Sequence, residues 1–109
     1  MTMDGDLYEV LNRSASEADF QSQLRSVALA RGWLYYNTYN SRRSDPGFPD
    51  AVLVRDDRLI FAELKSIKHR RPKPTDRQQI WLDALRLIPG IEVYLWYTDD
   101  IDQIEEVLR

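Results

Sequence analysis

The sequence predicts a single α/β domain, in which one helix precedes three strands, a second helix, a fourth strand and an optional terminal helix. Three observations predict this order. Apolar residues recur at helical spacing early in the chain, two apolar runs flank the acidic pair Asp56-Asp57, and glycine or proline ends several segments. With 109 residues, 43% of them hydrophobic, residues 1–109 have the size of one compact domain.

The first helix is expected over residues 16–31. Its buried face would carry four apolar side chains at helical spacing, Phe20, Leu24, Val27 and Ala28. Ser16 with Asp19, or Ser14 with Glu17, would supply an N-terminal capping box. Residues 1–15, which precede this helix, are expected to form a loose arm or a short helix.

A β-hairpin is the central predicted element. Gly32 ends the first helix, residues 33–39 form a first strand, and a polar loop over residues 40–48 leads to the hairpin at residues 50–65. Asp56-Asp57 is typical of a turn because short acidic residues tolerate turn geometry. The far ends of a hairpin lie side by side, so Asp50 should lie next to Glu63.

The second half of the chain repeats the alternation of helix and strand. A basic, proline-bearing loop over residues 67–74 leads to a helix that starts at Thr75 and ends before Pro89-Gly90. The side chains expected to anchor this helix to the core are Trp81, Leu82, Leu85 and Ile88. Residues 91–98 should form the fourth strand and residues 101–108 the terminal helix.

The open end of the hairpin gathers residues that can hold a metal ion and a phosphate. Side chains alternate faces along a strand, so Glu63 and Lys65 share one face while Leu64 points the other way. With Asp50 alongside, two carboxylates and one ammonium meet there. The chain has no cysteine, so an oxygen-liganded metal is the expected kind. Taken singly, Asp50 could be a turn residue and Glu63 an exposed strand carboxylate.

These residues resemble the two defining elements of the PD-(D/E)XK nuclease superfamily, Pro49-Asp50 and Glu63-x-Lys65. The resemblance implies a PD-(D/E)XK nuclease-like αβββαβ core, with a small mixed sheet flanked by helices. It also implies a metal-dependent nuclease.

More narrowly, the chain is similar to the VRR-NUC family of small phage and bacterial nucleases. This narrower resemblance adds Gly47 of Gly47-Phe48-Pro49-Asp50, the early-helix Glu17, and Gln78 three residues before Trp81. It extends over residues 17–97, which is most of the chain.

The resemblance assigns a role to each site residue. The ligands of Mg²⁺ or Mn²⁺ would be Asp50, Glu63, the backbone carbonyl of Leu64, and Glu17 either directly or through water. Magnesium prefers such hard oxygen ligands. Lys65 would position the attacking water or stabilise charge that develops on the phosphorane. No organic cofactor is implied.

Two of these residues have alternative structural explanations. Glu17 in the first turn of a helix stabilises the helix dipole by about 0.3–1 kcal/mol without any role in a site. Thr75 and Gln78 form a capping box, which explains Gln78 without catalysis. Gln21, one turn after Glu17 on the same face, is a weaker candidate for the site or for substrate contact.

The net charge of −3 argues against nucleic acid at first sight, but the charges are unevenly distributed. Acidic residues concentrate near the C-terminus. Basic residues form two clusters beside the expected site, and both are candidate phosphate contacts, although a charged run is also common in solvated loops. The candidates are Arg42, Arg43, Lys68, His69, Arg70, Arg71 and Lys73.

We therefore expect a Mg²⁺-dependent DNA endonuclease that is selective for branched or junction DNA and acts as a homodimer. The alternatives are a monomeric nicking or flap nuclease, a non-catalytic nucleic-acid-binding module with the same fold, and a protein-interaction subunit with an acidic face. The sequence carries neither an N-terminal signal-peptide pattern nor an apolar run of about 20 residues. The expected location is the cytoplasm, that of a host cell if the protein is phage-encoded, with no membrane association.

Overall fold

The computed structural model describes residues 15–38 and 44–109. Nearly all of the expected N-terminal arm, together with Arg42 and Arg43, lies outside these residues. The described elements, in order, are α2 (Glu17–Ala30), β1 (Leu34–Asn37), β2 (Ala51–Arg55), β3 (Arg58–Lys65), α3 (Asp76–Arg86), β4 (Glu92–Tyr97) and α4 (Ile101–Leu108). The predicted mixed α/β class and the predicted order of elements are confirmed. None of the described helices is long and apolar enough to cross a membrane.

The four strands form one mixed sheet in the order β1-β2-β3-β4. β1 pairs with β2 and β2 with β3 in antiparallel orientation, and β4 pairs in parallel with β3. The turn between β2 and β3 has the predicted acidic pair at its tip, where Asp56 adopts a left-handed φ of 54°. Aspartate is one of the few non-glycine residues that tolerate this region. The turn therefore forms at the predicted position, Asp56-Asp57.

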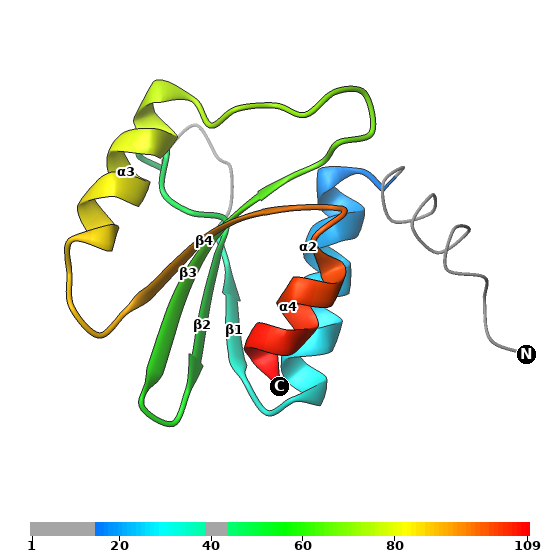
Figure 1. Cartoon of the computed structure of the whole chain (residues 1–109), viewed down its shortest axis with the longest axis vertical. Helices are drawn as coiled ribbons and strands as arrows, with labels where there is room; N and C mark the ends of the chain where they lie inside the picture. The colour runs from blue at the N-terminus through cyan, green and yellow to red at the C-terminus, as the bar shows by residue number, and fades with distance from the viewer. Residues whose placement is uncertain (1–14, 39–43) are drawn as a thin grey trace, which may run out of the picture.

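Helices α2 and α4 cover one face of the sheet, and α3 lies against the other (Figure 1). Side chains of β2, β3 and β4 that point toward α2 and α4 form the core with them. The largest fully buried apolar side chains of this core are Trp33, Trp96, Phe20, Leu24, Leu53, Ile60, Leu64, Ile104 and Leu108. This layer packs the sheet against α2. The packing sets the position of the N-terminal end of α2 relative to the C-terminal end of β3.

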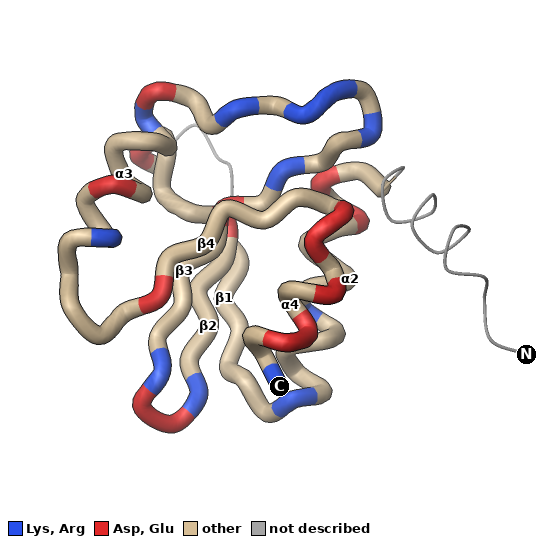
Figure 2. Tube along the Cα trace, viewed as in Figure 1, with Lys and Arg blue, Asp and Glu red and all other residues tan. Residues whose placement is uncertain are grey.

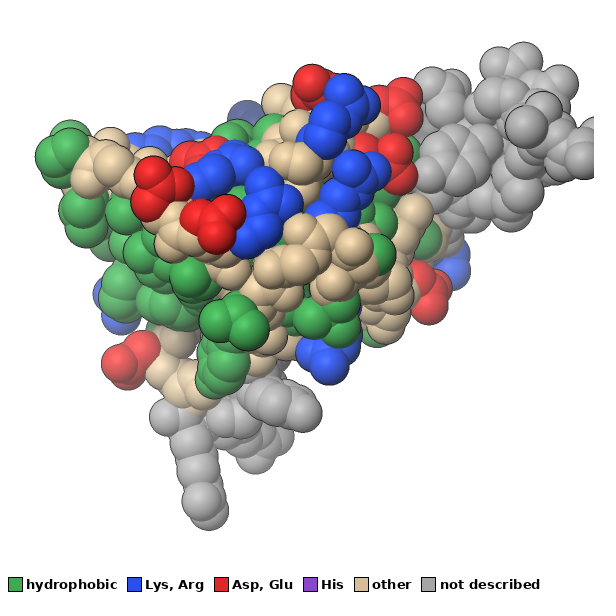
Figure 3. Space-filling view, turned by 90° about the horizontal axis from the view of Figure 1, so that it is seen from below, with side chains coloured by type: hydrophobic (Ala, Val, Ile, Leu, Met, Phe, Trp, Pro, Cys, Tyr) green, Lys and Arg blue, Asp and Glu red, His purple; other side chains and the backbone are tan. Residues whose placement is uncertain are grey.

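The second face of the sheet is only partly covered. Leu34 is paired with Val54 and Tyr36 with Val52, so these side chains form rows across β1 and β2. Leu34 is 73% exposed and Tyr36 is 62% exposed. Figure 3 shows hydrophobic side chains gathered over one side of the molecule. An apolar sheet surface is therefore open to solvent in the isolated chain.

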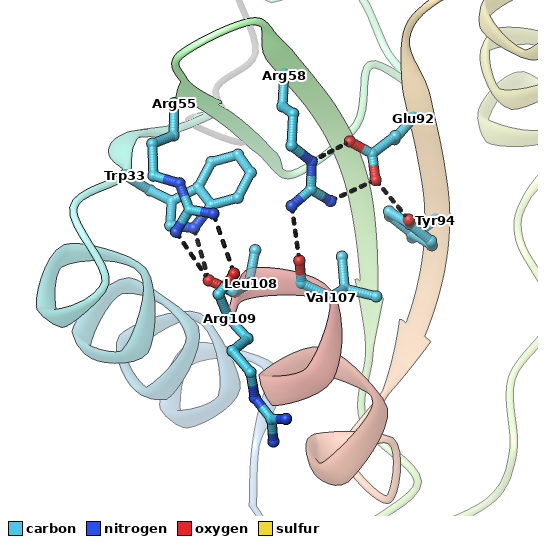
Figure 4. Close-up of polar contacts among 8 residues, drawn as sticks. All are labelled: Trp33, Arg55, Arg58, Glu92, Tyr94, Val107, Leu108 and Arg109. Atoms are coloured by element: carbon cyan, nitrogen blue, oxygen red, sulfur yellow. Dashed lines mark hydrogen bonds and ion pairs between the residues drawn. The ribbon is translucent and has the colours of Figure 1, made fainter.

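The C-terminal end of α4 is fixed to the sheet by arginine side chains (Figure 4). Arg55 donates hydrogen bonds to the carbonyl oxygens of Leu108 and Arg109, at 3.1 and 3.0 Å. Arg58 donates to the carbonyl oxygen of Val107 at 2.9 Å. Both guanidinium groups also lie over the ring of Trp33. These donors satisfy carbonyls that a helix end leaves without partners.

Two sequence expectations need correction. The first strand was expected over residues 33–39, of which residue 39 lies outside the described part of the chain, and it covers Leu34–Asn37. Trp33 is not part of the strand because it turns into the core, where its indole N–H donates to the carbonyl oxygen of Leu108 at 3.0 Å. Ile88 was expected to anchor α3 but lies beyond the last helical residue and is 50% exposed. Helical spacing does not apply to a residue outside the helix.

Candidate active site

The register of the hairpin places Asp50 opposite Glu63. Ala51 pairs with Ala62, and Asp50 and Glu63 are the next residues beyond this pair at the open end of the hairpin. The Asp50 side chain is held there because its Oδ2 accepts a hydrogen bond from the Leu64 N–H at 2.9 Å. Its backbone carbonyl accepts one from the Thr38 N–H at 2.8 Å. The predicted pair of carboxylates therefore forms, with one member fixed by the backbone of β3.

Glu63 is a buried carboxylate whose two oxygens differ. Its side chain is 1% exposed. Oε1 accepts a hydrogen bond from Nε2 of Gln78 at 3.1 Å, whereas Oε2 is buried and has no hydrogen-bond partner. Nearly all buried polar atoms in proteins are paired, so this oxygen is available to accept a further partner, such as a bound cation.

The surroundings of Glu63 disfavour its charged form. Burial, followed by the proximity and charge of the Asp50 carboxyl group, raises the pKa of Glu63 to about 9. The charge of Glu17 adds to the rise, and the ammonium of Lys65 opposes it. At neutral pH the metal-free pair therefore keeps a proton that a bound cation would displace.

Lys65 is the last residue of β3 and lies on the same face as Glu63 by strand alternation. Its side chain is only 9% exposed, and its backbone carbonyl accepts a hydrogen bond from the Thr98 N–H at 3.2 Å. Because β4 runs parallel to β3, Lys65 pairs with Tyr97 and is supported on that side. The carboxylate and the ammonium are thus placed by one rigid strand.

Gln78 has both of the roles that the sequence left open. Its Oε1 accepts from the Thr75 N–H at 2.9 Å, and its own N–H donates to the Thr75 hydroxyl at 3.2 Å, which completes the capping box of α3. Because the cap occupies the amide oxygen, the amide nitrogen is the atom that faces Glu63. The helix cap thereby orients the hydrogen-bond donor of the site.

The segment before Asp50 is anchored to the same helix. Gly47 has a φ of +95°, and a Cβ at this position would lie 2.6 Å from the backbone carbonyl carbon of Arg77. Only glycine fits such a contact. The ring of Phe48 packs edge-on against Trp81 and Phe61. The glycine on which the family resemblance drew therefore has a steric function, because it brings the Asp50 segment against α3.

Glu17 lines a pocket at the start of α2. The pocket has a volume of about 380 Å³ and lies between the start of α2 and the basic loop. Its lining residues are Ser16, Glu17, Ser66, Lys68, His69, Arg70 and Pro72. From the sequence we expected Glu17, Lys68, His69 and Arg70 to lie near the site. The structure brings these four residues together in the lining of this pocket. The cap of α2 is the Ser16–Asp19 box, so Glu17 is free of that role.

The basic loop contains cations of two kinds, and Figure 2 shows them between β3 and α3. Arg71 forms an ion pair with Asp99 at 3.1 Å, and its guanidinium lies 4.0 Å from the centre of the Tyr97 ring. The Tyr97 hydroxyl also donates to the Pro72 carbonyl at 2.8 Å. Arg71 thus holds the loop in place through these contacts, although both Arg71 and Lys73 on the same loop are exposed.

The oxygen donors of the site suit a hard cation. Among residues 15–38 and 44–109, no group of three or more His, Cys, Asp or Glu side chains is placed to hold a metal ion. The available oxygen donors are the carboxylates of Asp50 and Glu63 and the main-chain carbonyl groups at the end of β3. Magnesium often uses one or two carboxylates together with waters, so this donor set fits it.

Sequence reasoning missed a second group of polar residues at this end of the sheet. Arg25, Tyr35 and Asn37 line a pocket between α2 and β1 with Gln21. No motif marks them, because they come together only when α2 packs on β1. Searches of family models, of curated proteins and of solved structures give no match to this chain. The resemblance to nucleases therefore depends on the residues and geometry described above.

Proposed function

We propose that this chain is a Mg²⁺-dependent DNA endonuclease of the VRR-NUC type within the PD-(D/E)XK superfamily. The observation that carries the proposal is the buried Glu63, whose Oε2 has no hydrogen-bond partner. Asp50 lies beside Glu63, and Lys65 lies on the same face of β3. The order of helices and strands and the mixed four-stranded sheet support the αβββαβ core that this family implies.

Asp50, Glu63 and the backbone carbonyl of Leu64 would hold Mg²⁺ or Mn²⁺, with Glu17 contributing through water. When bound, the ion would offset charge on the scissile phosphate and lower the pKa of a water that attacks it. The raised pKa of Glu63 supports this assignment, since a site built for a cation is unfavourable for two bare carboxylates without one.

The protein's own groups would divide the remaining work. Lys65 would stabilise negative charge that grows on the phosphate as the reaction proceeds, at short range in a partly dry site. Gln78 holds one oxygen of Glu63 and leaves the other for the ion. Lys68, His69 and Arg70 would hold the DNA backbone beside the cut.

The buried carboxylate also favours the proposed enzyme over its main rival, a non-catalytic binding module. A module that only binds phosphates gains nothing from Glu63, because the burial of a carboxyl group costs free energy and the carboxylate pair keeps a negative charge that repels DNA. Lys65 is buried next to it instead of reaching into solvent as a binding lysine would. These costs are reasonable only if the group does chemistry.

The second part of the proposal is a homodimer that cuts branched or junction DNA. One chain has a single carboxylate pair, and a symmetric pair of chains would present two. The exposed rows of Leu34, Tyr36 and Val54 support a second copy as the partner on this sheet face. Light scattering should give twice the chain mass for the wild type and one chain mass for Tyr36→Glu. A monomeric wild type that cuts DNA would favour the nicking or flap alternative.

The test of activity is cleavage of linear, flap, splayed and four-way DNA, with and without Mg²⁺ or Mn²⁺. Asp50→Ala should abolish cleavage while circular dichroism shows an intact fold. Asp57→Ala is the matched control, because it removes a carboxylate from the exposed turn of the same hairpin. Equal cleavage by wild type and Asp50→Ala would refute the proposed function.

A further inference from the structure

A second pocket lies on the side of α2 that faces β1. Its volume is about 340 Å³. Its lining residues are Ala18, Gln21, Ser22, Arg25, Tyr35 and Asn37. Unlike the pocket that contains Glu17, its lining includes no carboxylate and one permanent cation, Arg25. None of these residues takes part in holding the metal or in orienting Glu63.

A hydrogen-bond chain fixes the polarity of this pocket. The Tyr35 hydroxyl donates to Oδ1 of Asn37 at 3.0 Å, and Nδ2 of Asn37 donates to Oε1 of Gln21 at 3.2 Å. Each amide oxygen is therefore occupied from within the protein. The amide nitrogen of Gln21 remains as a donor next to the exposed guanidinium of Arg25. A ligand that accepts hydrogen bonds and carries negative charge suits this lining.

The pocket adjoins the carboxylate pair. Asn37 is the last residue of β1, and the next residue, Thr38, is bonded to the backbone of Asp50. Burial, followed by the charge of Asp50, raises the pKa of the Tyr35 phenol, so the charge of Asp50 reaches this pocket. The guanidinium carbon of Arg25 lies 6.0 Å from the centre of the Tyr35 ring. The pocket thus lies on the β1 side of Asp50, and the basic loop lies beyond Glu63.

We propose that this pocket binds a backbone phosphate of the DNA strand that flanks the scissile phosphate, through Arg25 and the amide nitrogen of Gln21. The inference rests on the proposed nuclease function and adds to it a second anchoring point. A strand crossing the carboxylate pair would be held on one side by the loop residues Lys68 and Arg70, and on the other by this pocket. Two anchors would fix the direction of the strand across the site.

The test removes the charge of Arg25 and the charge of one DNA phosphate, first separately and then together, and compares the losses of affinity. The DNA structure that the wild type cuts best carries a single neutral methylphosphonate at successive positions on either side of the cut. Affinity is measured with Ca²⁺ in place of Mg²⁺ so that the DNA stays intact. For the wild type, one flanking position should lower affinity about tenfold, the value of one hydrogen bond to a charged group. Arg25→Gln should lower affinity for unmodified DNA by a similar factor and show no further loss at that position.

Arg31→Gln is the matched control, since Arg31 is an exposed arginine at the other end of α2 and does not line the pocket. It should keep the full tenfold effect of the modified position. Additive losses in Arg25→Gln at every position, in a protein that cuts DNA normally with Mg²⁺, would overturn the pocket and leave the nuclease standing. A wild type that neither binds nor cuts DNA would overturn both.

Discussion

Glu63→Gln should change how the stability of the metal-free protein depends on pH. The pKa of Glu63 is raised from an ordinary value of 4.5 to about 9. Between these two values the folded chain binds one more proton than the unfolded chain, so the free energy of unfolding falls as pH rises through this window. Glutamine at this position resembles the protonated side chain and does not titrate.

The magnitude follows from the width of the window. From pH 4.5 to pH 7 the wild type should lose about 3 kcal/mol, at about 1.4 kcal/mol for each pH unit. The variant should lose none of this, so both proteins should have similar stability near pH 4.5 and the variant should be the more stable at pH 7. For a domain of this size the difference corresponds to a shift in Tm on the order of 10 °C.

The assay is thermal and urea unfolding from pH 4.5 to pH 8, in a chelator and then in excess Mg²⁺. Added Mg²⁺ should restore the wild type at pH 7 and leave Glu63→Gln unchanged, because a ligand that binds only the folded state stabilises it. Asp57→Asn should follow the wild type, as its carboxylate is exposed. Parallel pH profiles for wild type and Glu63→Gln would refute the reasoning about the buried proton.

Three further predictions concern the surroundings of the site. Lys65→Met should bind Mg²⁺ as the wild type does while single-turnover cleavage falls by orders of magnitude, and a variant that cuts normally at saturating DNA would make Lys65 a binding residue only. Gly47→Ala should lower the free energy of unfolding by about 1–3 kcal/mol, because its Cβ would strike the backbone of Arg77 and its φ is positive, and an unchanged urea midpoint would contradict this. Arg70→Gln should flatten the dependence of DNA affinity on salt by about one phosphate contact. Arg71→Gln should mainly reduce thermal stability, because Arg71 pairs with Asp99. Identical salt slopes for the two variants would disprove the assignment of Arg70 to DNA binding and of Arg71 to the structure of the loop.

The local parts of this fold could be predicted because the signals that set them are local. The hairpin follows from two apolar runs around Asp56-Asp57, and both capping boxes follow from residues three positions apart. The opposition of Asp50 and Glu63 then follows from the register of the hairpin alone. For the same reason Lys65 could be placed on the face of Glu63.

What the sequence left open depends on contacts between distant segments. Nothing in the order of residues shows that Glu63 is buried with one oxygen unpartnered, since α3 and the segment at Gly47 create that burial. The pairing of Arg71 with Asp99 joins residues 28 positions apart. The pocket around Arg25 likewise requires the packing of α2 on β1. Distance along the chain, more than residue type, separated what could be foreseen from what could not.

The side-chain amide of Gln78 serves both the cap of α3 and Glu63. Of the two residues that complete a capping box at this position, glutamate and glutamine, only glutamine can serve both. Rules for helix starts accept glutamate as readily as glutamine three residues after a threonine cap, and a negative charge there favours the helix dipole. Glutamate at 78 would, however, set a third carboxylate against Glu63, where a donor is needed. Gln78→Glu would therefore satisfy every helix rule and still damage the site. A redesign of this scaffold for stability would select that change, and only a functional screen would reveal the loss.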